Sequence, residues 1–132
     1  MAARTDLVLM DRATTPVAHT FTPDGDDING VHLFSEKTPF RAGDPRFSSR
    51  LRYTKGKYRP HLKMAVPIVA TQTLNGVASP VIVRMNYVDC QFTFDGLSTP
   101  QERADVVGMF YSSLAPGQAM INDLVVNLTD SY

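Results

Sequence analysis

RFSSRLRYTKGKYRPHLKMAVPIV, residues 46–69, predicts two β-strands joined by a tight turn. Polar and apolar residues alternate along both halves, which is the period of strands that bury one face and expose the other. Residues 54–57 between them have turn chemistry, with Gly56 able to adopt a positive φ. This hairpin predicts an antiparallel sheet at the centre of the fold.

The outward face of this hairpin is rich in basic side chains. It combines the polar groups of Ser48, Arg50, Arg52, Arg59, His61 and Lys63. Residues 45–88 contain no acidic residue, although the whole chain is neutral, with 13 basic and 13 acidic residues. Such segregation of charge favours an anionic partner, RNA above all. The alternative is a solvated face that only keeps the protein soluble.

A later strand, predicted over residues 81–95, adds two residues to this face. Val88, Cys90 and Phe92 alternate toward the core, so Tyr87 and Asp89 point the other way. A tyrosine ring can stack on an unpaired base. A carboxylate can accept a hydrogen bond from the exocyclic amine of a base. Recognition of single-stranded RNA loops uses such a mixture of groups.

The order of the remaining elements predicts an α+β fold. We expect a single domain over residues 1–132, with an N-terminal β-hairpin over 1–22, an antiparallel sheet over 30–95 and two helices over 99–128. Residues 70–80 are expected to form a polar loop between two strands. Because two helices cannot cover both faces of such a sheet, the basic face is expected to be bare.

The two predicted helices are amphipathic. Thr99-Pro100-Gln101-Glu102 is a capping box with proline at the first helical position, and residues 115–117 separate the helices. The apolar stripes contain Val107, Phe110, Tyr111 and Leu114, followed by Ile121, Leu124 and Val125. Two short, strongly apolar helices predict burial against a second copy of the chain, and hence a homodimer.

No residue pattern indicates catalysis or metal binding. The three histidines have no metal-ligand spacing, and no phosphate-binding glycine loop or nucleophile elbow occurs. Residues 24–27 are acidic but lack the order of a calcium loop. The single cysteine, Cys90, is expected in the core of a protein from a reducing compartment. We therefore expect no enzyme activity and no cofactor. We also expect no targeting segment and no membrane contact.

Three segments resemble the coat proteins of single-stranded RNA bacteriophages of the levivirus type. Residues 66–81 are similar to a loop and its flanking strands in these proteins. Residues 87–94, with Ser98-Thr99 and Glu102-Arg103, are similar to the last strand and first helix. Residues 128–132 resemble the C-terminus. Length and element order agree over all 132 residues.

The resemblance implies an N-terminal hairpin, a five-stranded antiparallel sheet and two C-terminal helices that interlock with those of a second subunit. It further implies that dimers assemble in the bacterial host cytoplasm into an icosahedral shell, the virion, with the sheet facing the genomic RNA. A maturation protein is then a further virion partner. In relatives the same surface binds an RNA hairpin at the replicase start and represses translation, so an operator hairpin is an expected partner.

The resemblance also assigns residues by position. The RNA-contacting strands of the family correspond to Ser48, Arg50, Arg52, Arg59, His61, Lys63, Tyr87 and Asp89. His61 and Arg50 stand where relatives often carry small hydroxyl or amide residues that form a base pocket. The resemblance therefore does not imply which hairpin sequence this chain prefers.

A loop that meets around the symmetry axes of the shell corresponds to Thr71, Gln72, Thr73, Leu74, Asn75, Gly76, Val77 and Pro80. Asn75-Gly76 provides backbone freedom, and the bond before Pro80 can be cis or trans at small cost. Some relatives link this loop with cysteines. This chain has none there, so its shell is expected not to depend on disulfides.

Three hypotheses of different classes result from these observations. The main one is a capsid protein that binds RNA. The second is a dimeric RNA-binding regulatory protein that never assembles into a shell. The third is a small enzyme, for which the sequence offers no site.

Overall fold

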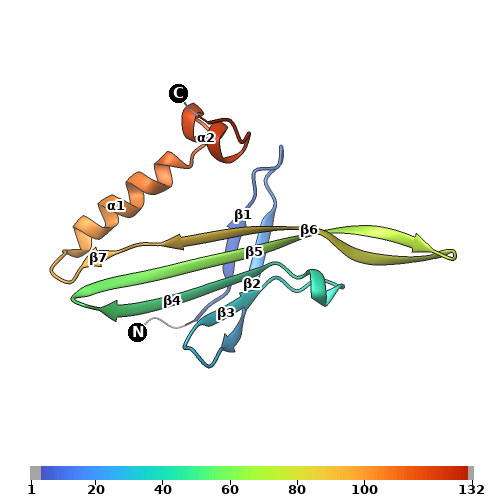
Figure 1. Ribbon diagram of the computed structural model, residues 1–132, viewed down its shortest axis with the longest axis horizontal. Helices are drawn as coiled ribbons and strands as arrows, with labels where there is room; N and C mark the ends of the chain where they lie inside the picture. Colours follow the sequence, from blue (N-terminus) through green and yellow to red (C-terminus); the bar gives the residue numbers. More distant parts are fainter. Residues whose placement is uncertain (1–3, 131–132) are drawn as a thin grey trace. The chain divides into compact units, whose positions relative to one another are not determined.

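A computed structural model of the protein describes residues 4–130 (Figure 1). The first residues of the predicted N-terminal hairpin and the last two residues of the family-like C-terminus lie outside the described residues. The chain separates into two compact units, residues 1–93 and residues 94–132, and each is described by itself.

The first unit is an antiparallel sheet in which each strand pairs with the next along the chain. Its elements are β1 (Leu7–Met10), β2 (Ala18–Asp26), β3 (His32–Ser35), the 3-10 turn η1 (Arg41–Gly43), β4 (Arg46–Thr54), β5 (Lys57–Leu74) and β6 (Val77–Gln91). The second unit contains the short strand β7 (Phe94–Asp95) and the helices α1 (Pro100–Ser113) and α2 (Ala119–Val125). The predicted α+β fold, strands first and two helices last, is confirmed, with seven strands among residues 4–130.

The predicted N-terminal hairpin is continuous with the sheet. The first part of β2, from Ala18 to Phe21, pairs with β1, and the part from Thr22 to Asp26 pairs with β3. A register irregularity between Pro23 and Gly25 interrupts the second pairing. One strand, β2, therefore belongs to both the hairpin and the sheet, so the hairpin is not separate from the sheet as expected.

Two turns of two residues set the register of the central strands. Lys55 and Gly56 join β4 to β5 with φ values of 54° and 74°. Asn75 and Gly76 join β5 to β6 with φ values of 52° and 79°. Positive φ at both positions matches the right-handed twist of the flanking strands and favours tight hairpins. The hairpin predicted at Gly56 is confirmed.

The loop predicted over residues 70–80 is wrong, because β5 and β6 continue up to Asn75-Gly76. Leu74 lies opposite Val77, and Thr71 lies opposite Pro80. All residues from 70 to 80 are exposed. A strand pair in water on both faces carries no apolar alternation, so its sequence looks like a loop. The peptide bonds of the described residues, including the one before Pro80, are trans.

Two predicted element boundaries also need correction. The strand expected over residues 81–95 begins at Val77 and ends at Gln91. The second helix ends at Val125, earlier than the predicted residue 128, and Leu128 has a φ of 57°. A left-handed residue cannot continue a right-handed helix. The capping box of α1 is present in both directions between Thr99 and Glu102, as predicted.

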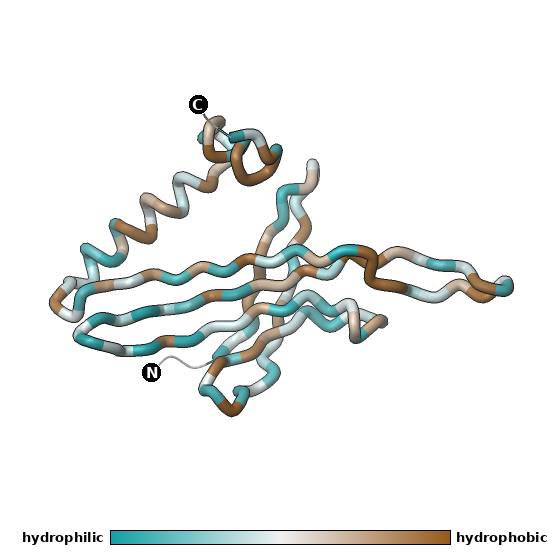
Figure 2. The backbone as a smooth tube through the Cα atoms, in the orientation of Figure 1, coloured by the Kyte–Doolittle hydropathy of each residue, from teal (hydrophilic) through white to brown (hydrophobic). Residues whose placement is uncertain are grey.

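The core of the first unit is an aromatic cluster from three adjacent strands. The ring centroid of Phe47 lies 6.4 Å from that of Phe21 and 6.5 Å from that of Phe34, both edge to face. Phe21 and Phe34 are 3% and 7% exposed and are the buried apolar residues of the described chain. In the second unit, no described residue of α1 or α2 is buried. Hydrophobic segments nevertheless lie along both helices (Figure 2). Many large apolar side chains of the described residues are therefore exposed in the single chain.

We expect Phe34→Ala to lower the free energy of unfolding by about 3–5 kcal/mol, because a buried ring is lost from an aromatic cluster. Denaturant titration of the soluble protein, followed by circular dichroism, measures this change. Ile28→Ala is the matched control, because Ile28 lies fully exposed in the turn between β2 and β3. Equal losses in the two variants would contradict the placement of the core.

Candidate nucleic-acid interface

All eight residues expected to contact RNA lie on one face of the sheet. Residues directly opposite in an antiparallel pair share a face. Three rows cross β4, β5 and β6, namely Ser48–Lys63–Asp89, Arg50–His61–Gln91 and Arg52–Arg59. A fourth row, Arg46–Ala65–Tyr87, adjoins the first. We call this surface the basic face and define it as Arg46, Ser48, Arg50, Arg52, Arg59, His61, Lys63, Tyr87 and Asp89.

The opposite face of the same strands is largely apolar. Phe47 lies in a row with Met64 and Val88, and the next row contains Leu62 and Cys90. The two sets of residues alternate strictly, as the period of a strand requires. The predicted division into an apolar and a basic face is confirmed for the central strands. The end of the sheet at the β4–β5 turn is mostly hydrophilic (Figure 2).

A single carboxylate interrupts the cations of the basic face. Asp89 accepts a hydrogen bond from the ring Nε2 of His61, and its Oδ2 lies 4.0 Å from Nζ of Lys63. The His61 hydrogen bond is the main reason that the pKa of Asp89 lies below its ordinary value. Both Asp89 and Lys63 remain accessible, with side chains 65% and 57% exposed. The carboxylate therefore stays ionised and available to a hydrogen-bond donor from a ligand.

Tyr87 presents an aromatic surface beside this cluster. It is 73% exposed and lies on β6 two residues before Asp89, on the same face. An exposed ring can stack on any base, because every base has a π-face. The face thus combines cations, an exposed aromatic ring and a hydrogen-bond acceptor.

A cavity of about 770 Å³ opens beside the same rows. Its polar lining comes from the basic face and from the segment before β4. These residues are Asp24, Ser35, Lys37, Arg41, Asp44, Arg46, Ser48, Lys63, Tyr87 and Asp89. Sequence reasoning did not single out Lys37 and Arg41. They follow β3 in a loop without a period, so only the closeness of two basic residues in the sequence could have pointed to them.

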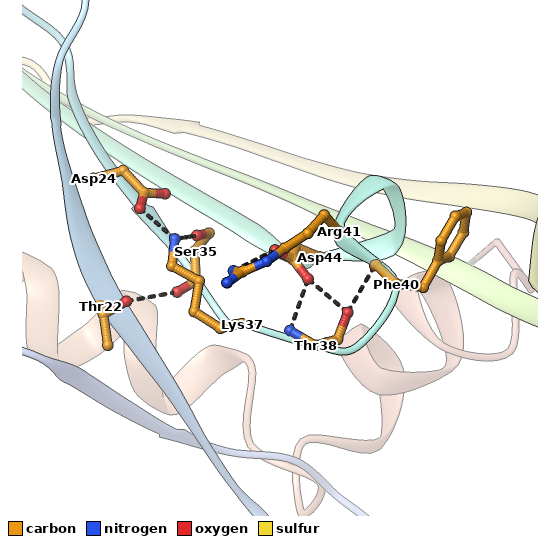
Figure 3. Close-up of polar contacts among 8 residues, drawn as sticks. All are labelled: Thr22, Asp24, Ser35, Lys37, Thr38, Phe40, Arg41 and Asp44. Atoms are coloured by element: carbon orange, nitrogen blue, oxygen red, sulfur yellow. Dashed lines mark hydrogen bonds and ion pairs between the residues drawn. The ribbon is translucent and has the colours of Figure 1, made fainter.

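Hydrogen bonds fix the loop that forms one wall of this cavity (Figure 3). Nζ of Lys37 donates to Asp24 and to the hydroxyl of Ser35. The backbone N–H of Thr38 donates to Oδ1 of Asp44 at 2.8 Å. Arg41 lies 3.5 Å from the same carboxylate. The cavity wall is therefore held in shape before any ligand arrives.

Electrostatics keep the two carboxylates of this wall ionised. The main cause for Asp44, which is buried, is the hydrogen bond from the Thr38 hydroxyl, which holds the pKa of this carboxyl below its usual range. The ammonium of Lys37 does the same for the pKa of Asp24. Their negative charges offset the cations of the loop, so the excess positive charge lies on the basic face.

The other expected site residues lie in two exposed regions. Thr71, Gln72, Thr73 and Leu74 end β5, Asn75 and Gly76 form the turn, and Val77 and Pro80 begin β6. In the second unit, Val107, Phe110, Tyr111 and Leu114 lie on α1 or its C-cap, and Ile121, Leu124 and Val125 lie on α2. Tyr111 is 78% exposed and Val125 is 56% exposed.

Residues 4–130 contain no group of three histidine, cysteine or acidic side chains placed to hold a metal ion. Within the described chain, no helix is both long enough and apolar enough to cross a membrane.

Comparisons with known proteins agree with this geometry. The Levivirus coat protein family model matches residues 2–132. The capsid protein of Pseudomonas phage PRR1 is 41% identical over 128 residues, which cover 96% of this chain and 97% of that protein.

Solved structures share the fold. The virus-like particle of bacteriophage ESE058 matches with a TM-score of 0.84 and 24% identity, over 99% of this chain and 100% of the other. The capsid protein of bacteriophage GA matches with a TM-score of 0.77 and 20% identity, over 96% and 95%. With nearly its whole length matched by the family model and by a close relative, this chain belongs to the levivirus coat proteins and is a structural capsid protein, not an enzyme.

Proposed function

We propose that this coat protein forms homodimers that assemble into an icosahedral shell, and that the basic face lines the inside of the shell and packages the genomic RNA. The virion is its location, and the cytoplasm of the bacterial host is where assembly takes place. A maturation protein joins the shell as a minor partner. Residues 1–132 act as one domain, whose two units are completed by the second subunit.

The observation that carries the RNA proposal is the concentration of cations on one face. Arg46, Arg50, Arg52, Arg59 and Lys63 share this surface with the single carboxylate of Asp89. Phosphate neutralisation by such a surface releases counterions and supplies binding without regard to sequence. Packaging of a whole genome needs binding of this kind.

Recognition of one RNA hairpin needs more than charge. Tyr87 supplies a stacking surface, and the cavity beside Ser48 and Lys63 is large enough for an unpaired base. Asp89 accepts hydrogen bonds only, so it favours a base that presents an amine. These features support binding of an operator hairpin and repression of replicase translation by the same surface.

Dimerisation follows from the incomplete core. Val107 and Phe110 of α1 and its C-cap residue Leu114 are 42–46% exposed. Full burial of a large apolar side chain in an interface contributes about 1.5–3 kcal/mol to the free energy of association. We propose that these stripes, with Ile121, Leu124 and Val125 of α2, interlock with the helices of a second subunit. The exposed hairpin around Asn75-Gly76 then provides the contacts between dimers.

The shell itself is tested first. Negative-stain microscopy of the purified recombinant protein should show uniform closed particles, and the same fraction should absorb strongly in the nucleic-acid band. A small dimer without shells at any salt concentration would instead support the regulatory RNA-binding hypothesis.

We expect Arg59→Ala to weaken RNA binding by the isolated dimer and to reduce the slope of log affinity against log salt by about one, because one phosphate contact is lost. Filter binding of a single-stranded RNA over a salt series measures both quantities. Arg84→Ala is the matched control, because Arg84 lies opposite Ile68, on the other face of the sheet. Equal effects of the two substitutions would contradict the assignment of the basic face.

Introduction of a charge into the helical stripe should abolish the soluble dimer. Phe110→Asp and Leu124→Asp each place a carboxylate in the proposed apolar interface, where burial of an unpaired charge is costly. Sedimentation measures the outcome, and Gln101→Glu adds the same charge in the first turn of α1 as a control. A well-folded soluble monomer, or an unchanged dimer, would count against interlocked helices.

A further inference from the structure

The backbone pairing joins the N-terminal arm to the rest of the first unit through one strand, β2. Two side-chain contacts add to it, because Phe21 packs against Phe47 and Arg4, which precedes β1, pairs with Asp26. We define the arm as β1, the following turn and the first part of β2, up to Phe21. β1 is the edge strand of the sheet and pairs with β2 (Figure 1). From Thr22 onward β2 pairs with β3 instead. The direction of the arm therefore depends on contacts near the point where β2 changes partner.

His19 makes two such contacts. It lies on β2 within the arm, opposite Leu9. Its ring Nε2 lies 2.9 Å from Oδ2 of Asp11, which follows β1. Its ring Nδ1 lies 2.9 Å from Oε2 of Glu36, which follows β3. One side chain thus joins the end of β1, on one side of β2, to the end of β3, on the other.

These contacts require a particular charge on the ring. Neutral imidazole has one N–H donor and one lone pair, whereas imidazolium donates from both nitrogens. Carboxylates only accept hydrogen bonds, so both contacts of His19 can be hydrogen bonds only when the ring is protonated. After deprotonation, one ring lone pair would face a carboxylate oxygen at 2.9 Å.

We propose that His19 is a proton-dependent clamp that holds the N-terminal arm to the end of β3, and that loss of the ring proton releases the arm. The device changes the mobility of the arm near neutral pH. It involves none of the residues of the basic face or of the helical stripes.

The charges around the ring are fixed by other bonds. The carboxylate of Asp11 also accepts the backbone N–H of Ala13 at 3.1 Å and of Val17 at 2.9 Å. It is therefore held in place within the turn of the arm. The cation next to Glu36 along the chain, Lys37, is bound to Asp24 and does not compete with the imidazolium. His19 is 36% exposed at its side chain, so protons can exchange with solvent.

The titration of these groups gives the pH window. Hydrogen bonds to Asp11, which has the larger effect, and to Glu36 raise the pKa of His19 above its ordinary value of 6.5. Hydrogen bonds from the Val17 N–H, which has the largest effect, and from His19 lower the pKa of Asp11 from 3.8 to about 2. A raised histidine pKa means that the clamp is complete below 6.5 and is lost as the pH rises through the raised value. On the acid side, the Asp11 contribution is complete above 3.8 and is lost as the pH falls through about 2.

Hydrogen exchange of the wild-type dimer tests the clamp. Protection factors, which correct for the intrinsic pH dependence of exchange, are compared for peptides of the arm at about pH 5.5 and about pH 8.5. We expect several-fold lower protection of the arm at the higher pH, with little change in β4 and β5. In His19→Gln the arm should be poorly protected at both pH values.

His32→Gln is the matched control. His32 also contacts a carboxylate, Asp26, but through one ring nitrogen. Asp26 ends β2, away from the arm, and His32 begins β3 opposite it. This variant should keep the pH dependence of the arm. Wild-type protection that does not change with pH, or a pH dependence that survives in His19→Gln, would overturn the proposal.

A second measurement does not rely on the variant folding. Titration of the His19 ring in the wild-type dimer by NMR should give a midpoint above 6.5, and arm protection should fall over the same pH range. A midpoint at or below 6.5, or a change in protection over a different range, would equally overturn the proposal.

Discussion

The register of β4, β5 and β6 is the constraint on which the rest of this structure depends. Because strand side chains alternate, a slip of one residue would exchange the faces of a whole strand. Two tight turns, at Lys55-Gly56 and Asn75-Gly76, prevent such a slip by fixing which residues lie opposite each other. Cations that are scattered in sequence thereby become one surface, and the core residues between them become the other.

The second constraint is incomplete burial. Phe21, Phe34 and Phe47 form a compact cluster, but the helices bury none of their described residues within the single chain. Incomplete burial suits a coat protein, because apolar surface that is exposed in the monomer is available for contacts between subunits. The same apolar area then contributes to both folding stability and assembly. Association with a second chain therefore stabilises the folded state relative to the monomer.

Under the proposed RNA-binding role, the basic face has to meet two requirements that conflict. General packaging improves with every added cation, since each can neutralise a phosphate. Asp89 works against this, because it removes net charge beside Lys63 and engages His61. A carboxylate in this position fits the proposal that the surface also discriminates among bases, because base contacts specify sequence whereas phosphate contacts do not.

Local pattern in the sequence was enough to predict the alternating hairpin of residues 46–69, the capped start of α1 and the segregation of charge, because each depends on neighbours within a few residues. The same reasoning mistook residues 70–80 for a loop, since a strand pair exposed on both faces lacks the apolar alternation by which strands are recognised. It also passed over Lys37 and Arg41, which reach the cavity only because the chain folds back from β3 to β4. The sequence by itself determined the faces of the strands and the family. Only the tertiary structure decided that His19 meets Asp11 and Glu36 and that five strands line one cavity, because these contacts join residues that no local period relates.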